Sequence, residues 1–166
     1  MAKKDAAKAK APGKADDSGI KIVARNRRAR HDYELMERVE AGMVLTGTEV
    51  KSLRNGRANL EDAYAEINGG EIWLNGCDIP EYVQGNRENH LPKRSRKLLL
   101  HRREIAKLEN RTSEKGITLI PLSIYFKKGM AKVELSLAKG RKTFDKREAI
   151  KKQDAKRDID RAMRRR

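Results

Sequence analysis

The fold class follows from one stretch of sequence, Ile117-Thr118-Leu119-Ile120-Pro121-Leu122-Ser123-Ile124-Tyr125-Phe126-Lys127-Lys128-Gly129-Met130-Ala131-Lys132-Val133-Glu134-Leu135-Ser136-Leu137. Its first ten residues are almost wholly apolar, which predicts a strand buried on both faces. Residues 131–137 alternate, so their apolar side chains should point into the core, with Lys132, Glu134 and Ser136 directed outward. The Lys-Lys-Gly turn joins the two strands as a hairpin. The chain should therefore be mainly β.

Upstream of this hairpin, the pattern predicts further short strands. Residues 63–67 and 71–74 alternate. The Asn68-Gly69-Gly70 segment between them is a strong hairpin signal, because glycine adopts the positive φ that such turns require. Another β-run starts at Tyr33 and breaks near Ala41-Gly42.

Two short helices and one long loop complete the core. The first helix is predicted at residues 48–53, ended by Asn55-Gly56, and the second at residues 98–108, with Gly116 closing that segment. Residues 80–97 lack periodicity and should form a loop. Five or six strands and two helices favour a small closed or partly closed barrel, with a sandwich as the alternative.

Two aromatic residues share one face of the predicted hairpin. Tyr64 and Trp73 lie opposite Ile67 and Ile72. They could form a base-stacking platform or a second core layer. We favour the core, because a small barrel with few aromatic residues needs their bulk.

The net charge of +16 is concentrated at the two ends of the chain. Residues 1–30 hold ten Lys/Arg against three Asp/Glu, and residues 139–166 hold thirteen against five. We therefore expect a disordered basic arm (1–24), a barrel (25–138) and a basic tail (139–166). The tail contains helix formers but few apolar residues, so it should be disordered alone and helical on a partner.

A charge surplus of this size indicates a polyanionic partner. Nucleic acid fits better than a membrane surface, because the tail has no broad apolar face. The chain has no run of 18 apolar residues and no signal-peptide pattern at its start. The single cysteine, Cys77, forms no intrachain disulfide, which favours a cytoplasmic location. A merely soluble basic protein is the plain alternative.

The sequence carries no recognisable catalytic motif. A P-loop is missing, and the three histidines show no metal-ligand spacing to each other or to Cys77. Cys77 is better explained as a small buried residue than as a nucleophile. Glu61-Asp62 is an acid pair at a strand start, where solvation explains it, although a nuclease would need converging carboxylates. We expect no enzyme activity, no metal and no cofactor.

Three strings are more specific than the composition. They are Gly47-Thr48-Glu49-Val50-Lys51-Ser52-Leu53-Arg54, His90-Leu91-Pro92-Lys93-Arg94-Ser95-Arg96-Lys97-Leu98-Leu99-Leu100 and Ala138-Lys139-Gly140-Arg141-Lys142-Thr143-Phe144-Asp145-Lys146-Arg147. In this order, over about residues 26–147, the chain resembles the SmpB family. That family is the bacterial partner of transfer-messenger RNA (SsrA RNA) in trans-translation.

The resemblance implies an oligonucleotide-binding (OB) barrel of about six strands with two to three short helices. It also implies three partners: transfer-messenger RNA, the ribosome and elongation factor Tu. The barrel would hold the tRNA-like domain of the RNA. The tail would lie as a helix in the vacant mRNA channel of a stalled ribosome, near the decoding centre of the small subunit, and report that no message is there.

The same comparison and the local charge together yield the candidate site residues. Those expected to bind RNA are Glu49, Lys51, Ser52, Arg54, Lys93, Arg94, Arg96, Lys97, Leu99, Lys132 and Lys139. Those expected to serve the ribosome-facing step are Gly140, Arg141, Lys142, Phe144, Asp145, Lys146 and Arg147. At Phe144 some family members carry a histidine; phenylalanine keeps a face for stacking on a base but loses the hydrogen bond and charge.

Several of these residues have a plain structural alternative. Glu49 could accept from base amino groups or a 2′-hydroxyl, or it could be a residue that interacts with the helix dipole. The cations between Lys93 and Lys97 could contact phosphates or form a solvated loop, and their density favours phosphate.

Three functions remain open at this point. The first is a non-enzymatic RNA adaptor of trans-translation, and the second is a structural ribosomal or general RNA-binding protein with the same barrel and arms. The third is a nuclease. Selective binding of one tRNA-like RNA separates the first from the second, and metal-dependent loss of RNA identifies the third.

Overall fold

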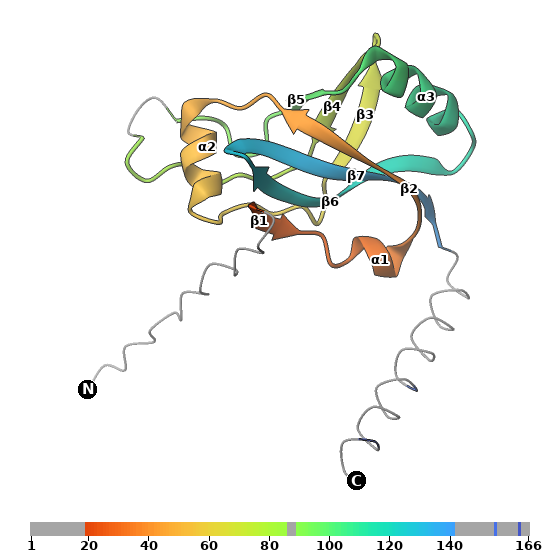
Figure 1. Ribbon diagram of the computed structural model, residues 1–166, viewed down its shortest axis with the longest axis horizontal. Coiled ribbons are helices and arrows are strands. Elements are labelled where there is room, and N and C mark those ends of the chain that lie inside the picture. The colour runs from red at the N-terminus through yellow and green to blue at the C-terminus, as the bar shows by residue number, and fades with distance from the viewer. Residues whose placement is uncertain (1–18, 86–88, 142–154, 156–162, 164–166) are drawn as a thin grey trace.

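A computed structural model describes residues 19–85 and 89–141, together with the single positions 155 and 163. It contains seven strands and three helices in those residues (Figure 1). In chain order they are β1 (Ile20–Arg25), α1 (Ala29–Asp32), β2 (Tyr33–Met43), α2 (Gly47–Arg54), β3 (Tyr64–Asn68), β4 (Glu71–Asn75), β5 (Arg96–Leu99), α3 (Arg102–Thr112), β6 (Ile117–Lys127) and β7 (Met130–Gly140).

Six of the strands close into a barrel. The strand order is β1-β6-β3-β4-β5-β2-β7, and β7 pairs back onto β6, so the sheet has no free edge between them. Strand β1 is added to the outer side of this ring through β6. The predicted mainly β, OB-like barrel is confirmed, and the sandwich alternative is not. Helices α2 and α3 lie at opposite ends of the barrel (Figure 1).

The β6–β7 hairpin forms the longest pairing and behaves largely as its sequence predicts. Val133, Leu135 and Leu137 are almost fully buried in the core. Ser136 was expected to face solvent, yet it is buried too. The reason is a second small apolar cluster on the outer side of this hairpin, in which Ala29 of α1 covers Ala138 and its neighbours.

The helix at residues 48–53 is confirmed as α2, and its Leu53 is fully buried. The second helix starts later than predicted. Leu98 and Leu99 belong to strand β5, because their backbone pairs with β4 and β2. The helical spacing from Leu98 onward was therefore misleading, and α3 begins only at Arg102.

The predicted break at Ala41-Gly42 is wrong, because β2 runs through it without interruption. The irregularity lies instead between Leu35 and Arg38. Close packing explains why residue 42 is a glycine: a Cβ atom there would lie 3.3 Å from the Cβ of Leu99 on the neighbouring strand. The glycine at this position therefore reflects the close approach of two strands and not a turn.

Both ends of the barrel extend further than expected. Residues 20–24 were assigned to the disordered arm, but they form most of β1 and pair with β6 because Ile22 and Val23 have apolar partners there. Strand β7 continues to Gly140, and the Arg141 N–H donates to the Asp32 carbonyl at 3.1 Å. The rest of the arm (1–18) and nearly all of the tail lie outside the described residues.

The two hairpin aromatics do not form a core layer. Tyr64 is 45% exposed and Trp73 is half-buried, both on the outer face of β3 and β4. The inner face of this hairpin is already filled by Ala65, Ile72 and Leu74. Within the described ranges, no helix is long and apolar enough to span a bilayer.

Candidate nucleic-acid interface

Two of the predicted RNA-binding residues are brought together across three strands. Gly42 of β2 pairs with Leu99 of β5 on one side and with Lys132 of β7 on the other. Side chains at paired positions point to the same face, so Leu99 and Lys132 flank a glycine on the outside of the barrel. Leu99 is 55% exposed, and both residues line one concavity together with Glu40 and His101.

Lys132 is held in place by an acid that sequence reasoning missed. Glu40 of β2 forms an ion pair with Lys132, accepts the hydroxyl of Tyr125, and lies 3.2 Å from the Lys127 Nζ. Hydrogen bonds from Lys132 and Tyr125 lower the pKa of Glu40 to about 2. Burial and the contact with Glu40 raise the pKa of Tyr125, so its phenol stays protonated and donates.

A second concavity lies on the same outside surface, beyond strand β7. It is lined by Ile22 of β1, Tyr125 of β6, and the exposed cations Arg25, Arg27 and Arg30. These arginines belong to the β1–α1 connection, which the buried Asn26 anchors. The Asn26 side chain donates to the Leu60 carbonyl and accepts the Ala29 N–H, both at 3.0 Å.

We call the surface formed by these two concavities the outer face. Its residues are Arg25, Arg27, Arg30, Glu40, Gly42, Leu99, Tyr125, Lys127 and Lys132. It offers guanidinium and ammonium groups for phosphates, with the exposed apolar side chain of Leu99 between them for sugars and bases. The density of arginine in residues 25–30 was the sequence signal for half of it, although none of these arginines was among the predicted RNA-binding residues.

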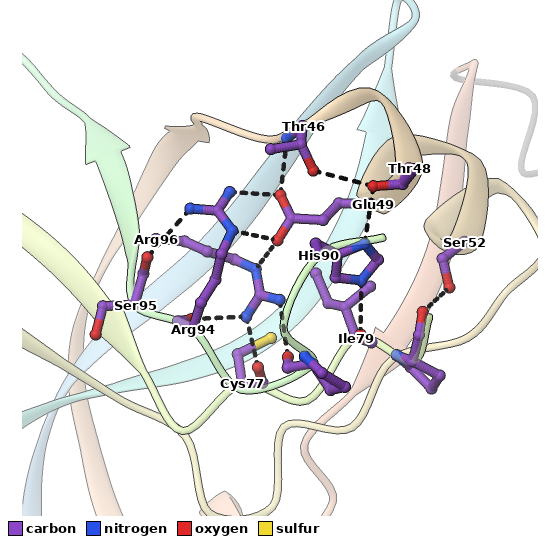
Figure 2. Close-up of polar contacts among 12 residues, drawn as sticks. Thr46, Thr48, Glu49, Ser52, Cys77, Ile79, His90, Arg94, Ser95 and Arg96 are labelled. Carbon is purple, nitrogen blue, oxygen red and sulfur yellow. Dashed lines mark hydrogen bonds and ion pairs between the residues drawn. The ribbon is translucent and has the colours of Figure 1, made fainter. Parts of the chain in front are cut away.

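The most specific motif residue, Glu49, lies elsewhere and is buried. Figure 2 shows its carboxylate between two guanidinium groups. Arg94 donates to it twice, at 2.8 and 2.5 Å, and Arg96 donates once, at 2.8 Å. The Thr46 N–H, just before α2, adds a fourth bond at 2.8 Å.

Arg96 uses its remaining donors on the backbone of the loop before β5. It donates to the carbonyls of Cys77, Pro92 and Arg94 at 2.6 to 3.0 Å. The side chains of Arg96 and Glu49 are both 0% exposed. This ion pair therefore fastens helix α2 to two separate parts of the chain.

Two further polar contacts tie the same loop to α2 (Figure 2). The His90 ring bridges the Thr48 hydroxyl at 3.0 Å and the Ile79 carbonyl at 2.9 Å. Ser52 donates to the Pro80 carbonyl at 2.6 Å. The first two motif strings are thus one structural unit, which we call the Glu49 clamp: Thr46, Thr48, Glu49, Ser52, His90, Arg94 and Arg96.

The electrostatics of Glu49 match this structural role. Burial alone would raise its pKa, but the hydrogen bonds from Arg94 and Thr46 and the charge of Arg96 outweigh that effect. The pKa is lowered, so the carboxylate stays ionised and paired. Direct RNA contact was predicted for Glu49, Ser52 and Arg96, but their buried side chains do not reach the surface.

The remaining predicted residues fall into three groups. Lys51, Arg54, Lys93 and Lys139 are exposed, whereas Arg94 is 30% exposed and Lys97 is paired with Glu71. Gly140 and Arg141 mark the point where the tail leaves β7 beside α1. Lys142, Phe144, Asp145, Lys146 and Arg147 lie outside the described residues.

Cys77 is buried, as its sequence context suggested. Burial raises the pKa of its thiol to about 11, although the nearby Arg96 cation opposes the shift. The thiolate that a nucleophile requires is therefore scarce at neutral pH. Among the described residues, no three His, Cys, Asp or Glu side chains gather as a metal site.

Comparison with known proteins supports the resemblance seen in the motif strings. The family model described as SmpB protein matches residues 23–165 of this chain. The chain belongs to the SmpB family. That match covers the barrel, the clamp and nearly all of the basic tail. The similarity of this chain to the family therefore extends well beyond the three motif strings.

Individual SmpB relatives are similar over most of their length. The chain is 57% identical to the SsrA-binding protein of Frankia casuarinae, covering 90% of this chain and 94% of that protein. It is 59% identical to the SsrA-binding protein of Thermobifida fusca, covering 89% and 92%. A chain from a solved structure of tmRNA-SmpB in the bacterial ribosome is 49% identical, with a TM-score of 0.63, covering 72% of this chain and 85% of that one.

Proposed function

We propose that this protein is a non-enzymatic RNA adaptor of trans-translation. It binds the tRNA-like domain of transfer-messenger RNA and delivers it, with elongation factor Tu, to stalled ribosomes. Two lines support the proposal: relatives that carry the name SsrA-binding protein, and the chain's likeness to SmpB in a ribosome structure. The observation that carries it is the outer face, where Leu99 and Lys132 meet across Gly42.

In this proposal each part of the outer face has a physical task. Lys132, steadied by Glu40, and the arginines of residues 25–30 neutralise phosphates. Leu99, which is exposed, contacts sugar and base surfaces where the RNA is not paired. The Glu49 clamp supports binding indirectly, because it fixes the loop that leads into β5 and thereby positions Leu99.

The tail has a separate task in the same proposal. Its start is anchored by the pairing of Gly140 with Tyr33, so the tail leaves from a defined point. Thirteen cations in residues 139–166 suit the RNA walls of the vacant mRNA channel. There Gly140, Arg141 and the residues from Lys142 to Arg147 serve the ribosome-facing step, with Phe144 stacking on a base.

A binding titration tests the first part. Purified protein is titrated with the tRNA-like domain and with bulk tRNA at about 50 and 200 mM salt. A preference for the tRNA-like domain that survives at the higher salt is expected, because shape recognition does not depend only on phosphate charge. If both RNAs weaken together, the protein is a general RNA binder and the adaptor proposal fails.

Two variants connect this titration to the outer face. Lys132→Ala and Leu99→Ser should each weaken binding of the tRNA-like domain, by about tenfold for one lost contact of 1–2 kcal/mol. Lys115→Ala is the matched control, because Lys115 is an exposed cation away from the outer face. Equal dissociation constants for all three variants would remove the outer face from the proposal.

Truncation separates the tail from the barrel. A chain that ends after Arg141 keeps the whole of β7 and its bond to Asp32, so the barrel should remain folded. It should bind the tRNA-like domain normally but fail to support peptide tagging in a translation assay with truncated message. Equal loss of RNA binding and tagging would contradict this division of labour.

A further inference from the structure

The chain contains three asparagines that are followed directly by glycine. The pairs are Asn55-Gly56, Asn68-Gly69 and Asn75-Gly76. Asparagine before glycine is the peptide sequence most prone to spontaneous deamidation, because glycine has no side chain to hinder attack by its own backbone nitrogen. Local sequence does not distinguish the three pairs, so a difference between their rates in the folded protein must come from the structure.

Deamidation needs only the two residues and water. The glycine nitrogen bonds to the asparagine Cγ, and the side-chain nitrogen leaves as ammonia, taking the proton of the glycine amide. Water then opens the succinimide ring at Cγ, which gives aspartate, or at the backbone carbonyl, which gives isoaspartate. The fold permits the first step where the glycine N–H is not already donating, the carboxamide is free and the backbone has room to rotate.

The turn between β3 and β4 meets all three conditions. Asn68 is the last residue of β3, and Gly69 and Gly70 form the turn with φ of 60° and 75°. Among the residues that the structure describes, neither the Gly69 N–H nor the Asn68 side chain has a hydrogen-bond partner. All three residues are exposed, and a Cβ atom on either glycine would have no neighbour within 4 Å.

At Asn55-Gly56 the attacking nitrogen is occupied. Asn55 caps the end of α2, and the Gly56 N–H donates to the Leu53 carbonyl at 2.9 Å. The next N–H, of Arg57, donates to the Ser52 carbonyl at 3.3 Å. Attack by the Gly56 nitrogen would break these bonds, so Asn55 should react only when the end of α2 opens.

At Asn75-Gly76 the space for the reaction is filled. Asn75 pairs with Tyr64 across the hairpin, and its side-chain amide donates to Glu66 at 3.3 Å. A Cβ atom on Gly76 would lie 2.6 Å from the Asp62 carbonyl oxygen, so the backbone of another segment packs directly against this glycine. The backbone here cannot rotate toward the succinimide without local unfolding.

We propose that Asn68 is a deamidation site of the folded protein, whereas the fold protects Asn55 and Asn75. Both products place a carboxylate at position 68, whose cross-strand partner is Glu71. Like charges directly opposite each other in a sheet are destabilising, and Glu71 already pairs with Lys97. Isoaspartate also adds one atom to the backbone of a turn that tolerates few geometries. The proposal is independent of the proposed function.

A weakened turn has a consequence for the barrel. Within the described strands, β3 pairs with β6 only at Ala65 and Leu119, and its other pairs are all with β4. The β3–β4 hairpin therefore supplies most of the hydrogen bonding that holds β3 in the ring. Because deamidation is irreversible without an enzyme, the fraction of protein with a weakened hairpin should rise with the age of the molecule.

The experiment compares the three sites in one sample. Full-length protein is incubated in mildly alkaline buffer, either folded or unfolded in urea, and digested at intervals. Mass spectrometry measures the conversion of each asparagine, and chromatography separates the aspartate and isoaspartate peptides. The unfolded sample is the reference for each site, because it keeps the neighbouring residues and removes the fold.

The expected rates distinguish Asn68 from the other two sites. In the folded protein Asn68 should react within about threefold of its unfolded rate, whereas Asn55 and Asn75 should be slowed at least about tenfold, because each must wait for local opening.

Two variants test the effect on the hairpin. Asn68→Asp reproduces the charge of one product, and Asn68→Ser cannot deamidate; position 68 is exposed, so both should fold. The Tm of Asn68→Asp should lie about 1–4 °C below that of Asn68→Ser, because of the acid opposite Glu71. The Tm of wild-type protein should fall as it ages, in step with conversion at Asn68, whereas that of Asn68→Ser should not.

Three outcomes would overturn the proposal. Folding that slows Asn68 as much as the other two sites would mean that the turn is closed to the reaction. Faster conversion at Asn55 or Asn75 than at Asn68 would mean that those contacts do not protect. An equal fall in Tm for aged wild-type protein and aged Asn68→Ser would show that deamidation does not weaken the hairpin. RNA selectivity of fresh protein bears only on the proposed function.

Discussion

The buried Glu49 clamp predicts a large and specific loss of stability when one charge is removed. Glu49→Gln keeps the size of the side chain and its ability to accept the Thr46 N–H. It removes the negative charge that Arg96, 0% exposed, and Arg94, 30% exposed, both face. Arg96 would then remain as an uncompensated cation in the interior.

The magnitude follows from the burial of the pair. Breaking a fully buried ion pair by removing one partner costs about 3–5 kcal/mol, mainly because the other charge stays desolvated. Arg96 retains its three backbone acceptors, so we expect the lower half of that range, about 3–4 kcal/mol. For a domain of this size, the corresponding fall in Tm is about 10–15 °C.

The assay is urea and thermal unfolding of the full chain, followed by far-ultraviolet circular dichroism. Glu104→Gln is the matched control, because Glu104 occupies the equivalent third position of α3 and accepts the His101 N–H at 3.0 Å. Its carboxylate is not enclosed by buried cations, and glutamine also serves in a capping box. The control should therefore lose less than about 1 kcal/mol.

The comparison between the two variants shows whether the loss of stability comes from the buried charge pair or from the helix cap. A loss at Glu49 of less than about 1 kcal/mol, equal to that at Glu104, would mean that the clamp contributes only a helix cap. A large loss at both positions would mean that capping, and not the buried charge, is responsible. Only a large difference between them supports the clamp as the element that fastens the loop to α2.

Three further predictions follow from single contacts. Gly42→Ala should weaken binding of the tRNA-like domain, measured by titration, because its Cβ would press on Leu99 at 3.3 Å; unchanged affinity would contradict that placement of Leu99. The pKa of Glu40, lowered to about 2, contributes stability that is present above about pH 4.5 and lost as the pH falls towards 2. Acid unfolding of Glu40→Gln should therefore show a weaker pH dependence in that window, though exposure of the Glu40–Lys132 pair keeps the effect small. Cys77, with a thiol pKa of about 11 and no exposure, should react with a thiol reagent only as fast as the protein unfolds; rapid labelling in native buffer would contradict its burial.

The sequence indicated the barrel well because its signals are local. The β6–β7 hairpin is defined by alternation and a Lys-Lys-Gly turn, and the β3–β4 hairpin by Gly69 and Gly70, which both take positive φ. Such features depend on residues that are close together in the chain, so these hairpins form independently of the tertiary contacts around them. At Leu98 and Leu99 the local pattern predicted a helix, but pairing with β2 places both residues in strand β5.

The sequence by itself determined the mainly β class, the segregation of charge to the two ends, and membership of an RNA-binding family. It could not determine which charges face the solvent. Glu49 and Arg96 are 47 residues apart, and only the closure of the barrel brings them together as a buried pair. Glu40, Leu99 and Lys132 likewise come from three strands and meet only through sheet register. Tertiary contacts decide whether a charged side chain is enclosed in the interior, as at Glu49 and Arg96, or stays at the surface, as at Lys132.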